Sequence, residues 1–314
     1  MAQTRAIVDK LLTNVSLGYL PSGHIAEVAL PTLQVQAMTG LIGQYTNQHL
    51  RIEDTQMGGE AMAKRVKSVG YDTTQGYEVG EFGLEDVVTP ADIVNIDDTG
   101  IFKAESDKVM GLTHLLKVKK EKVFADLVTN ASVITQGVTL SGTTQWSDYV
   151  NSLPINDIKT ARGVVKAASG FFPNRAIMSP RVAEILSYHP HVLNNIEFNW
   201  EKAGGLTFED IKKFLKVDIL HIGDVHYETA VEGLASSLGE LWVNDVVLYY
   251  APTSAGKFQK SLGYYLQLAG KGGQKVYKAP IVNPPGSTSL IVKDDYGFKI
   301  TNAPCAYLIT NAIA

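Results

Sequence analysis

The stretch that decides the fold covers residues 104–130 and reads AESDKVMGLTHLLKVKKEKVFADLVTN. Its apolar residues recur at helical spacing, which places them on one stripe of a helix. No proline interrupts the stretch, and at about 1.5 Å per residue it would be on the order of 40 Å long, well beyond the typical globular helix. The sequence therefore predicts one long helix that crosses the molecule. The stripe consists of Val109, Leu112, Leu116, Val123 and Leu127, widened by Leu115, Phe124 and Val128.

The middle of this predicted helix is charged. Lys117, Lys119, Lys120 and Lys122 surround Glu121, and two of these lysines fall where the apolar stripe should continue. No aromatic residues that would stack on nucleic-acid bases interleave with the lysines. We interpret the cluster as a solvated helix face that tolerates single alanine substitutions. The two apolar ends then need separate partners, namely the closing strands on one side and a hairpin or arm on the other.

The composition places the chain among ordinary folded proteins. Its 314 residues suffice for one large domain or two ordinary ones, and 45% hydrophobic and 19% charged residues argue against wholesale disorder. The formal net charge of −4 argues against a protein that coats itself in nucleic acid. The single cysteine, Cys305, excludes an intrachain disulfide. The chain contains no run of 18 consecutive apolar residues, so no membrane span is predicted. We therefore expect the protein to be cytoplasmic in the cell that makes it.

Residues 1–45 are predicted to form an arm. A short amphipathic helix over residues 7–12 is followed by glycines and prolines that interrupt regular structure. Residues 30–37 then alternate between apolar and polar, as in an extended strand. So much apolar surface needs a partner, and two possibilities are open. The arm is buried either against a neighbouring subunit or against its own domain.

Residues 46–90 carry a charge asymmetry that predicts a long two-stranded hairpin. A basic strand would face an acidic one, and opposite charges across the strands would help to set their register. A lone hairpin is at best marginally stable in water, so it should lie on something. Lys64 or Lys67 could also bond covalently to an asparagine, although nothing in the sequence selects one. The basic residues are Arg51, Lys64, Arg65 and Lys67, and the acidic ones are Asp72, Glu78, Glu81, Glu85 and Asp86.

The rest of the chain divides into two patterns around the long helix. Residues 89–92, Thr-Pro-Ala-Asp, have the capping threonine, proline and first-turn acid that begin a short helix. Residues 150–270 alternate short helices and strands, which predicts a compact α/β domain with a longer strand over 241–250. The last residues are strands and turns, with a hairpin turn at 294–297 and a final strand paired into a sheet.

No catalytic, cofactor-binding or metal site is predicted. His189 and His191 flank a proline, and with His221 and His226 they would form a metal site only if the fold brought them together. Residues 270–273, Gly-Lys-Gly-Gly, lack the spacing of a phosphate-binding loop and lead into no helix. No nucleophile elbow or cysteine-centred motif is present.

The order of parts, from arm through hairpin, long helix and α/β domain to closing strands, resembles the major capsid protein of tailed bacteriophages, with the Hong Kong ninety-seven-like shell fold. Local patterns carry the resemblance along nearly the whole chain. The arm pattern is ALPTLQV at 29–35 with Gly40 and Tyr45, the loop pattern is EVGEFGL at 78–84, and the helix pattern is LLKVKKEKVFA at 115–125. The axial-domain patterns are PNRAIM at 173–178, LWVNDVVLYYAP at 241–252 and Gly263-Tyr264.

The resemblance implies an α+β fold with four parts. These are an N-terminal arm at 1–45, an extended loop at 46–90, a peripheral domain at 91–149 and 271–314 with the long helix as its spine, and an α/β axial domain at 150–270. It also implies a structural protein, not an enzyme and without cofactors, that self-assembles through pentamers and hexamers into an icosahedral shell around double-stranded DNA.

Further partners and a location follow from the same resemblance. A scaffolding protein, a portal and decoration proteins would be partners, DNA would be met only by non-specific proximity, and no membrane would be involved. The protein would reside in the virion capsid, and in the host cytoplasm during assembly. The chain lacks the long extension before the arm that serves some relatives as a scaffold. We therefore expect either a mature, cleaved form or assembly on a separate scaffolding protein.

Two other functions remain open at this point. One is an encapsulin-like bacterial nanocompartment shell with the same fold, which would enclose a cargo enzyme instead of a genome. The other is a soluble α/β enzyme whose pocket residues come from His189, His191 and the axial-type domain. Nuclease-resistant DNA inside purified particles separates the first alternative from a phage head, and closed particles exclude the second.

Overall fold

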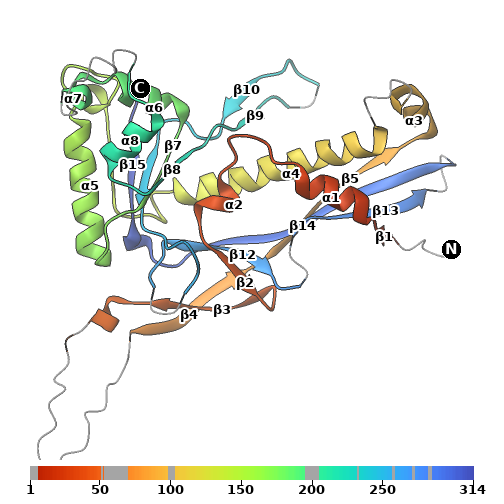
Figure 1. The fold of residues 1–314 in the computed structure, drawn as a ribbon, viewed down its shortest axis with the longest axis horizontal. Helices are drawn as coiled ribbons and strands as arrows, with labels where there is room; N and C mark the ends of the chain where they lie inside the picture. Colours follow the sequence, from red (N-terminus) through yellow and green to blue (C-terminus); the bar gives the residue numbers. More distant parts are fainter. Residues whose placement is uncertain are drawn as a thin grey trace, which may run out of the picture.

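The computed structural model describes residues 6–50, 52, 70–97, 103–194, 205–231, 233–256, 259–270, 273–281 and 285–314. In these ranges the protein has a mixed α+β fold, as the sequence predicts. Figure 1 shows a long helix lying along one sheet, a second sheet flanked by helices at one end of that helix, and a strand pair that extends away from the body.

The predicted long helix is confirmed as α4, Ala104–Val128. Glu105 and Asp107 stand in its first turn, where negative charge suits the positive end of the helix dipole. The short helix before it is α3, Pro90–Asp97, and Thr89 and Asp92 form the predicted cap, each accepting a hydrogen bond from the other's backbone N–H. Helix α1, Lys10–Gly18, packs beside α4.

The sheet beneath α4 is called here the β14 sheet. Its order is β1 (Ile7–Val8), β13 (Lys275–Ile281), β14 (Ser287–Ile300), β12 (Gly263–Leu268) and β2 (Thr32–Val35), and β5 (Gly80–Val88) also pairs with β14. One edge of β14 pairs first with β13 and then with β12, and its other edge pairs with β5. All these pairings are antiparallel except that of β12 with β2.

The hairpin turn predicted at residues 294–297 is wrong. These residues lie inside β14, which runs unbroken for 14 residues. Asp294 is buried on the face of β14 that meets α4, where it finds a lysine partner. Gly297 allows the backbone of β4 (Tyr71–Glu78) to approach, because a Cβ there would lie 2.3 Å from the carbonyl oxygen of Glu78. Tertiary partners therefore override the local turn signal of the Asp-Asp-Tyr-Gly sequence.

The second sheet, called here the β11 sheet, forms the centre of the helical end of the molecule. Its order is β6 (Gly137–Thr139), β15 (Ala306–Thr310), β11 (Val246–Tyr249), β7 (Arg175–Met178) and β8 (Ile219–Ile222). One face packs on α5 (Pro154–Ser169), α6 (Pro180–Tyr188) and α8 (Phe208–Leu215), and the other packs on the C-terminal part of α4. Burial on both faces explains why β7 and β11 are buried at every position.

Local sequence signals begin and end the helices of this region. Gly170, in the left-handed conformation with φ of 87°, ends α5. Ser179 caps α6 and Thr207 caps α8 through their side chains. The remaining described elements are α2 (Ala26–Ala29), α7 (Pro190–Leu193), β3 (Thr39–Tyr45), β4 (Tyr71–Glu78), β9 (His226–Glu228), β10 (Leu238–Glu240) and the 3-10 turns at Asn47–Leu50, Gly142–Thr144 and Ala303–Cys305.

The described part of the predicted arm docks on its own chain. The helix predicted over residues 7–12 begins later than expected: Ile7 and Val8 pair with β13 as β1, and α1 starts after Asp9, whose carboxylate caps it. The predicted strand is confirmed as β2, which pairs with β12. Docking on the same chain was one of the two possibilities, and it leaves several apolar side chains of the arm exposed.

The predicted hairpin differs in its strand pairing. β3 pairs with β4 as a ribbon below the β14 sheet in Figure 1, and just after β3 the Asn47 side chain donates to the carbonyl oxygen of Ala168 in α5. Asp72 and Glu78 lie opposite Gln44 and Thr39, and the acidic residues of β5 lie opposite β14, so the described acidic residues do not face a basic strand. The basic residues Arg51, Lys64, Arg65 and Lys67 lie outside the described residues.

Strand pairing crosses the predicted division at residues 150 and 270. β6 and β15, which the prediction assigned to the peripheral domain, belong to the β11 sheet. β12, assigned to the axial domain, belongs to the β14 sheet. The strand predicted over 241–250 is confined to β11. Pairing between strands far apart in the chain leaves no local trace in the sequence. The periodicity of apolar residues therefore does not predict which sheet each strand joins.

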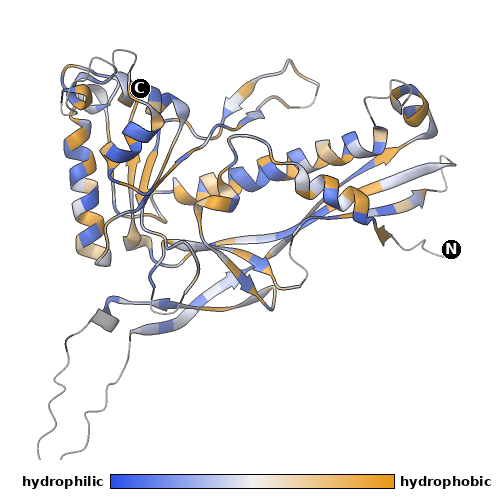
Figure 2. Cartoon of the chain, in the orientation of Figure 1, coloured by the Kyte–Doolittle hydropathy of each residue, from blue (hydrophilic) through white to orange (hydrophobic). Residues whose placement is uncertain are grey.

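The two apolar ends of α4 pack in separate cores, as predicted. The predicted division of partners is wrong, because parts of the arm and of the closing strands contact both ends. The N-terminal half packs with α1, β13 and β14, and the C-terminal half packs with α2, β11 and β12. Figure 2 shows hydrophilic residues gathered along the middle of the helix. Leu115 was placed on the apolar stripe but is 57% exposed, so that assignment is wrong. The buried apolar residues are Val109, Leu112 and Leu116 in one half, and Phe124, Ala125 and Val128 in the other.

Candidate functional site: the charged waist of the long helix

The charged waist of α4 is defined here as Lys117, Lys120 and Glu121, between the two apolar ends. The exposed fractions of these three residues are only 7%, 2% and 0%. The interpretation of the cluster as a solvated face is therefore wrong for these three, whereas it is right for the exposed Lys119. The physical reason is that residues 19–29 and β14 cover the helix at this level.

Lys120 stands at the centre of a buried ionic contact. Its Nζ lies 2.6 Å from Asp294 Oδ2 and 2.6 Å from Glu27 Oε1, and it donates to the Tyr265 hydroxyl at 3.2 Å. The same ammonium lies 4.7 Å from the ring centroid of Tyr296. Burial by itself lowers the pKa of Lys120, but Asp294, Tyr265 and Glu27 outweigh burial and raise it. The lysine is therefore charged, with partners from the arm and from β14 and β12.

Glu121 joins α4 to two further segments. One carboxylate oxygen accepts hydrogen bonds from the backbone N–H of Ile25 at 3.0 Å and of Ala26 at 2.8 Å, at the start of α2. The other accepts from Trp242 Nε1 at 2.8 Å. Burial raises the pKa of Glu121, while the bonds from Ala26, Trp242 and Ile25 lower it. The side chain thus ties the arm and the segment before β11 to the helix.

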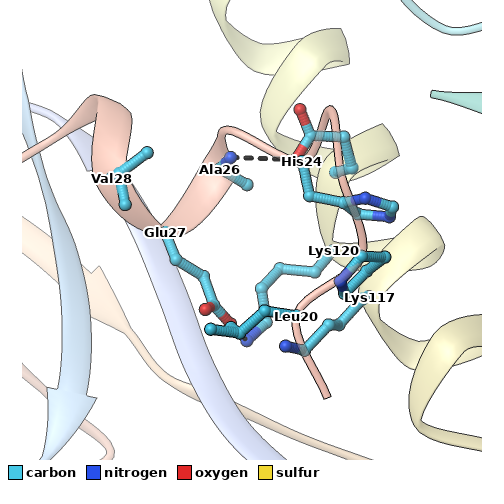
Figure 3. A pocket seen from close by; sticks show the side chains of 9 residues that line it. Leu20, His24, Ala26, Glu27, Val28, Lys117 and Lys120 are labelled. Atoms are coloured by element: carbon cyan, nitrogen blue, oxygen red, sulfur yellow. Dashed lines mark hydrogen bonds and ion pairs between the residues drawn. The ribbon is translucent and has the colours of Figure 1, made fainter. Parts of the chain in front are cut away.

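Lys117 completes the waist on the arm side. Its Nζ donates to the carbonyl oxygen of Tyr19 at 2.6 Å, and burial lowers the pKa of this lysine. A cavity of about 140 Å³ lies beside it, lined by the arm and α4. Figure 3 shows Lys117 and Lys120 reaching from α4 toward the end of the Glu27 side chain, with His24 farther along the arm. Burial lowers the pKa of His24, and His114 and Lys117 add to that effect.

The arrangement of the waist is suited to fixing segments in register. Its ammonium and carboxylate groups take their partners from within the protein, and the partners come from the arm, β12, β14 and the segment before β11. Directional contacts of this kind specify one alignment of the segments, whereas apolar contacts tolerate sliding. The chemistry of the cluster is therefore structural.

The structure does not assemble the four candidate histidines into a site. His189 Nε2 lies 2.8 Å from Ser152 Oγ, and its Nδ1 accepts from the backbone N–H of His191. His221 is buried in β8, and His226 lies near acidic side chains on the exposed hairpin of β9 and β10. Among the described residues, no group of three or more His, Cys, Asp or Glu side chains is placed to hold a metal ion.

The other sequence candidates fall partly outside the described ranges. Lys271 and Gly272 of the glycine-rich segment, and both Lys64 and Lys67, are among the residues that the structure does not describe. Of the helices in the described ranges, none combines the length and apolarity that crossing a bilayer requires.

Sequence reasoning missed the buried role of the waist, although one signal was present. Lys120 stands four residues after Leu116 and four before Phe124, so helical spacing places it on the apolar stripe. A charged residue at a stripe position indicates a buried partner as well as a break in the stripe. The partner, Asp294, lay in a segment that was predicted to be a turn.

Comparison with known proteins finds relatives along most of the chain. No family model matches it. The major capsid protein of Burkholderia phage BcepMu is 23% identical over 275 residues, which is 84% of this chain and 84% of that protein. The major capsid protein of Pseudomonas phage JBD67 is 24% identical over 313 residues, covering 98% of this chain and 97% of that protein.

Solved structures share the fold. A phage-related protein from Bordetella bronchiseptica RB50 has a TM-score of 0.74 at 22% identity, covering 98% of both chains. The capsid structure of cyanophage P-SCSP1u has a TM-score of 0.55 at 9% identity, covering 93% of this chain and 90% of the other. A virus-like particle from Pyrococcus furiosus has a TM-score of 0.54 at 13% identity, covering 95% and 97%.

Proposed function

We infer that this chain is a major capsid protein of the tailed-phage type, with the Hong Kong ninety-seven-like fold, and that copies of it form the phage head shell. The observation that carries the inference is the length of the likeness, which reaches 98% of this chain and 97% of the Pseudomonas phage capsid protein. A likeness over this length includes the arm, ribbon, long helix and both sheets. The shared fold of solved capsids supports the same conclusion.

The surface of the subunit suits a shell. The arm and the ribbon of β3 and β4 leave large apolar side chains in solvent: Ile7, Leu11, Leu17, Leu20, Val28 and Leu41. Exposed apolar residues grouped on projecting segments are unfavourable for a monomer but gain contacts in a closed symmetric assembly. The described structure of one copy therefore leaves surface that further copies would bury.

The proposed parts follow the sheets. The β14 sheet with α4 as its spine is the peripheral domain, and the β11 sheet with α5 to α8 is the axial domain that gathers in pentamers and hexamers. The arm is residues 1–45, and its last strand, β3, pairs with β4 of the extended loop at residues 46–90. The shell encloses double-stranded DNA, and a scaffolding protein, a portal and decoration proteins are its partners during and after assembly.

Electron microscopy of the purified protein, with its scaffolding protein supplied where assembly requires one, tests the proposal. Closed particles of uniform size are the expected result. A compact monomer or dimer under every assembly condition, measured by size-exclusion chromatography, would contradict a shell function.

A nanocompartment shell is the second candidate, because the fold is also similar to that of a virus-like particle from Pyrococcus furiosus. The content of the particles separates the two functions. Particles isolated from infected or induced cells should protect DNA from added nuclease if the protein forms a phage head. Particles filled with a single cargo protein and free of protected DNA would favour the nanocompartment.

A further inference from the structure

An apolar cavity of about 400 Å³ opens on the outer side of α5. We call it the α5 socket. Its walls include Ile158, Phe172 and Phe214, and its rim carries the cations Lys159, Arg162 and Lys216. Phe172 is 53% exposed although it is a large apolar residue. A concave apolar surface with a basic rim is suited to an apolar side chain flanked by acidic groups.

The α5 socket is held in shape by its own contacts. The Arg162 guanidinium donates to the carbonyl oxygens of Leu215 at 2.9 Å and Lys216 at 2.6 Å, which joins α5 to the end of α8. The same guanidinium lies 5.2 Å from the ring centroid of Phe172, and Lys166 Nζ lies 5.0 Å from it. These contacts fix the Phe172 ring beside the opening.

A projecting hairpin on the same domain carries an apolar tip. It is formed by β9 and β10. Val231 and Leu234 between the strands and Leu238 at the start of β10 are 73%, 72% and 72% exposed. We call these three residues the knob. Residues 226–240 contain three glutamates and no lysine or arginine. Figure 1 shows the hairpin and α5 on opposite sides of the β11 sheet.

The described part of the loop behind the knob is ordered by hydrogen bonds before any partner binds. The Glu228 carboxylate accepts from the backbone N–H of Ala230 at 3.0 Å and of Ser237 at 2.6 Å, and from the Ser236 hydroxyl at 2.5 Å. The bonds from Ser236, Ser237 and Ala230 lower the pKa of Glu228. A loop ordered in advance loses less conformational entropy when it docks.

We propose that the knob of one copy inserts into the α5 socket of a second copy of this chain. The apolar tip fits the apolar walls, and the negative charge of Glu228, at the end of β9 next to the loop, complements the basic rim. Because knob and α5 socket are different surfaces, the contact is heterologous, and a heterologous contact closes into a ring when its rotation is a whole fraction of a full turn. The inference rests on the proposed shell function and names the side chains that join neighbouring axial domains.

Paired cysteines test the contact in assembled particles. Gly163 lies on α5 at the cavity, and a Cβ added there would meet no atom within 4 Å, so Gly163→Cys fits. Particles of the double variant Leu234→Cys, Gly163→Cys should oxidise to a ladder of linked chains up to the ring size on a non-reducing gel. Each single variant should give no ladder. The natural Cys305 is buried and does not interfere.

A matched control replaces the socket partner with a distant helical residue. Val94 of α3 is 71% exposed, close to the exposure of Leu234, and the pair Leu234→Cys, Val94→Cys should not cross-link. If the wild-type chain forms particles but the double variant gives no ladder, the knob contact is contradicted and the shell function is not. A product limited to dimers, or cross-linking of the socket cysteine to a different protein, would also overturn it. If the wild-type chain forms no particles, both proposals fail.

Charge substitutions give an independent measurement. Leu234→Asp and Phe172→Asp should each lower the yield of particles by about tenfold or more, because each places a carboxylate in an apolar contact. Leu234 is 72% exposed in the single subunit, so the melting temperature of the unassembled Leu234→Asp variant should stay unchanged. Phe172 also contacts Arg162 and Lys166, so the melting temperature of Phe172→Asp is measured beside its particle yield. Wild-type particle yield in both variants would contradict the proposal.

Discussion

The apolar ends of α4 and its charged waist are equally buried but are held by different kinds of contact. Phe124 and Leu116 pack among other apolar side chains, which supply contact area without fixing direction. Lys120 and Glu121 instead make short directional contacts to the arm, β12, β14 and the segment before β11. The ends therefore hold the helix in place, and the waist decides which residues of the other segments lie against it.

The difference matters for a subunit that must expose much of its surface to neighbours. An arm held only by apolar contacts could slide along the helix, whereas Glu121 accepts from two consecutive N–H groups at the start of α2. A shift of the arm by one residue would break both bonds. A single alignment in every copy is what a symmetric shell requires.

The largest expected effect comes from placing a charge in an apolar end. Phe124 is fully buried between Trp242 and Phe298, so Phe124→Asp creates a cavity and buries a carboxylate, with a loss of about 4 kcal/mol or more. We expect no particles by electron microscopy, and the same for Leu116→Asp. Leu115→Asp, on the exposed side of the same helix, is the matched control and should assemble. Normal particles from Phe124→Asp would show that the fold and its assembly do not depend on the packing of α4.

Breaking the waist should have the next largest effect. Lys120→Met leaves Asp294 buried without its partner, and the free energy of unfolding should fall by about 3–5 kcal/mol in urea titration of the unassembled subunit. The double variant Lys120→Met, Asp294→Leu removes both charges and should recover most of the loss. Lys119→Met on the solvated side is the control. If Lys120→Met is as stable as wild type, the waist does not stabilise the alignment of the segments that meet it.

The loss of stability at acidic pH compares the charged waist with His221, a buried group that is neutral in the folded protein. Burial, with Arg175 nearby, lowers the pKa of His221 to about 4, so folding favours its neutral form. Its contribution is fully present above pH 6.5 and is lost as the pH falls toward 4, by up to about 3 kcal/mol. Lys120, whose pKa is raised, stays charged throughout this window, and Glu121, whose pKa is also raised, contributes in the opposite sense.

The measurement is unfolding in urea at several pH values between 7 and 4. His221→Gln should flatten the decline in stability relative to wild type, and His226→Gln, on the exposed hairpin, should leave the decline unchanged. An unaltered slope in His221→Gln would assign the acid sensitivity to other groups, such as His24 and His189, whose pKa values burial also lowers.

The smallest effect is expected at the edge of the waist. Lys122 Nζ lies 3.2 Å from Asp126 across one helical turn, and the two side chains are 41% and 64% exposed. Lys122→Ala should cost about 0.3–0.5 kcal/mol, near the limit of detection by urea titration. A loss comparable to that of Lys120→Met would show that Lys122 makes a stabilising contact within the subunit beyond the pair with Asp126, such as its contact with the Tyr227 ring at 5.6 Å.

The sequence predicted the helices better than the strands. The bounds of α4, α5 and α8 follow from apolar spacing, the left-handed Gly170 and the capping Thr207, which act within a few residues of one another. The turn at 294–297 and the hairpin of 46–90 were wrong in their pairing, because strand partners are chosen by residues that lie far away in the chain. The likeness to phage capsid proteins was correct because it rested on the order of elements.

Two features of α4 show what the sequence determined and what the tertiary structure determined. The sequence by itself determined that residues 104–128 form one long helix with apolar ends, because helical spacing and the absence of proline are local properties. Only the tertiary structure decided that the lysines between those ends lie inside the protein. That outcome depended on Glu27 and Asp294 arriving from two distant segments, and a charge can be buried only where such partners meet it.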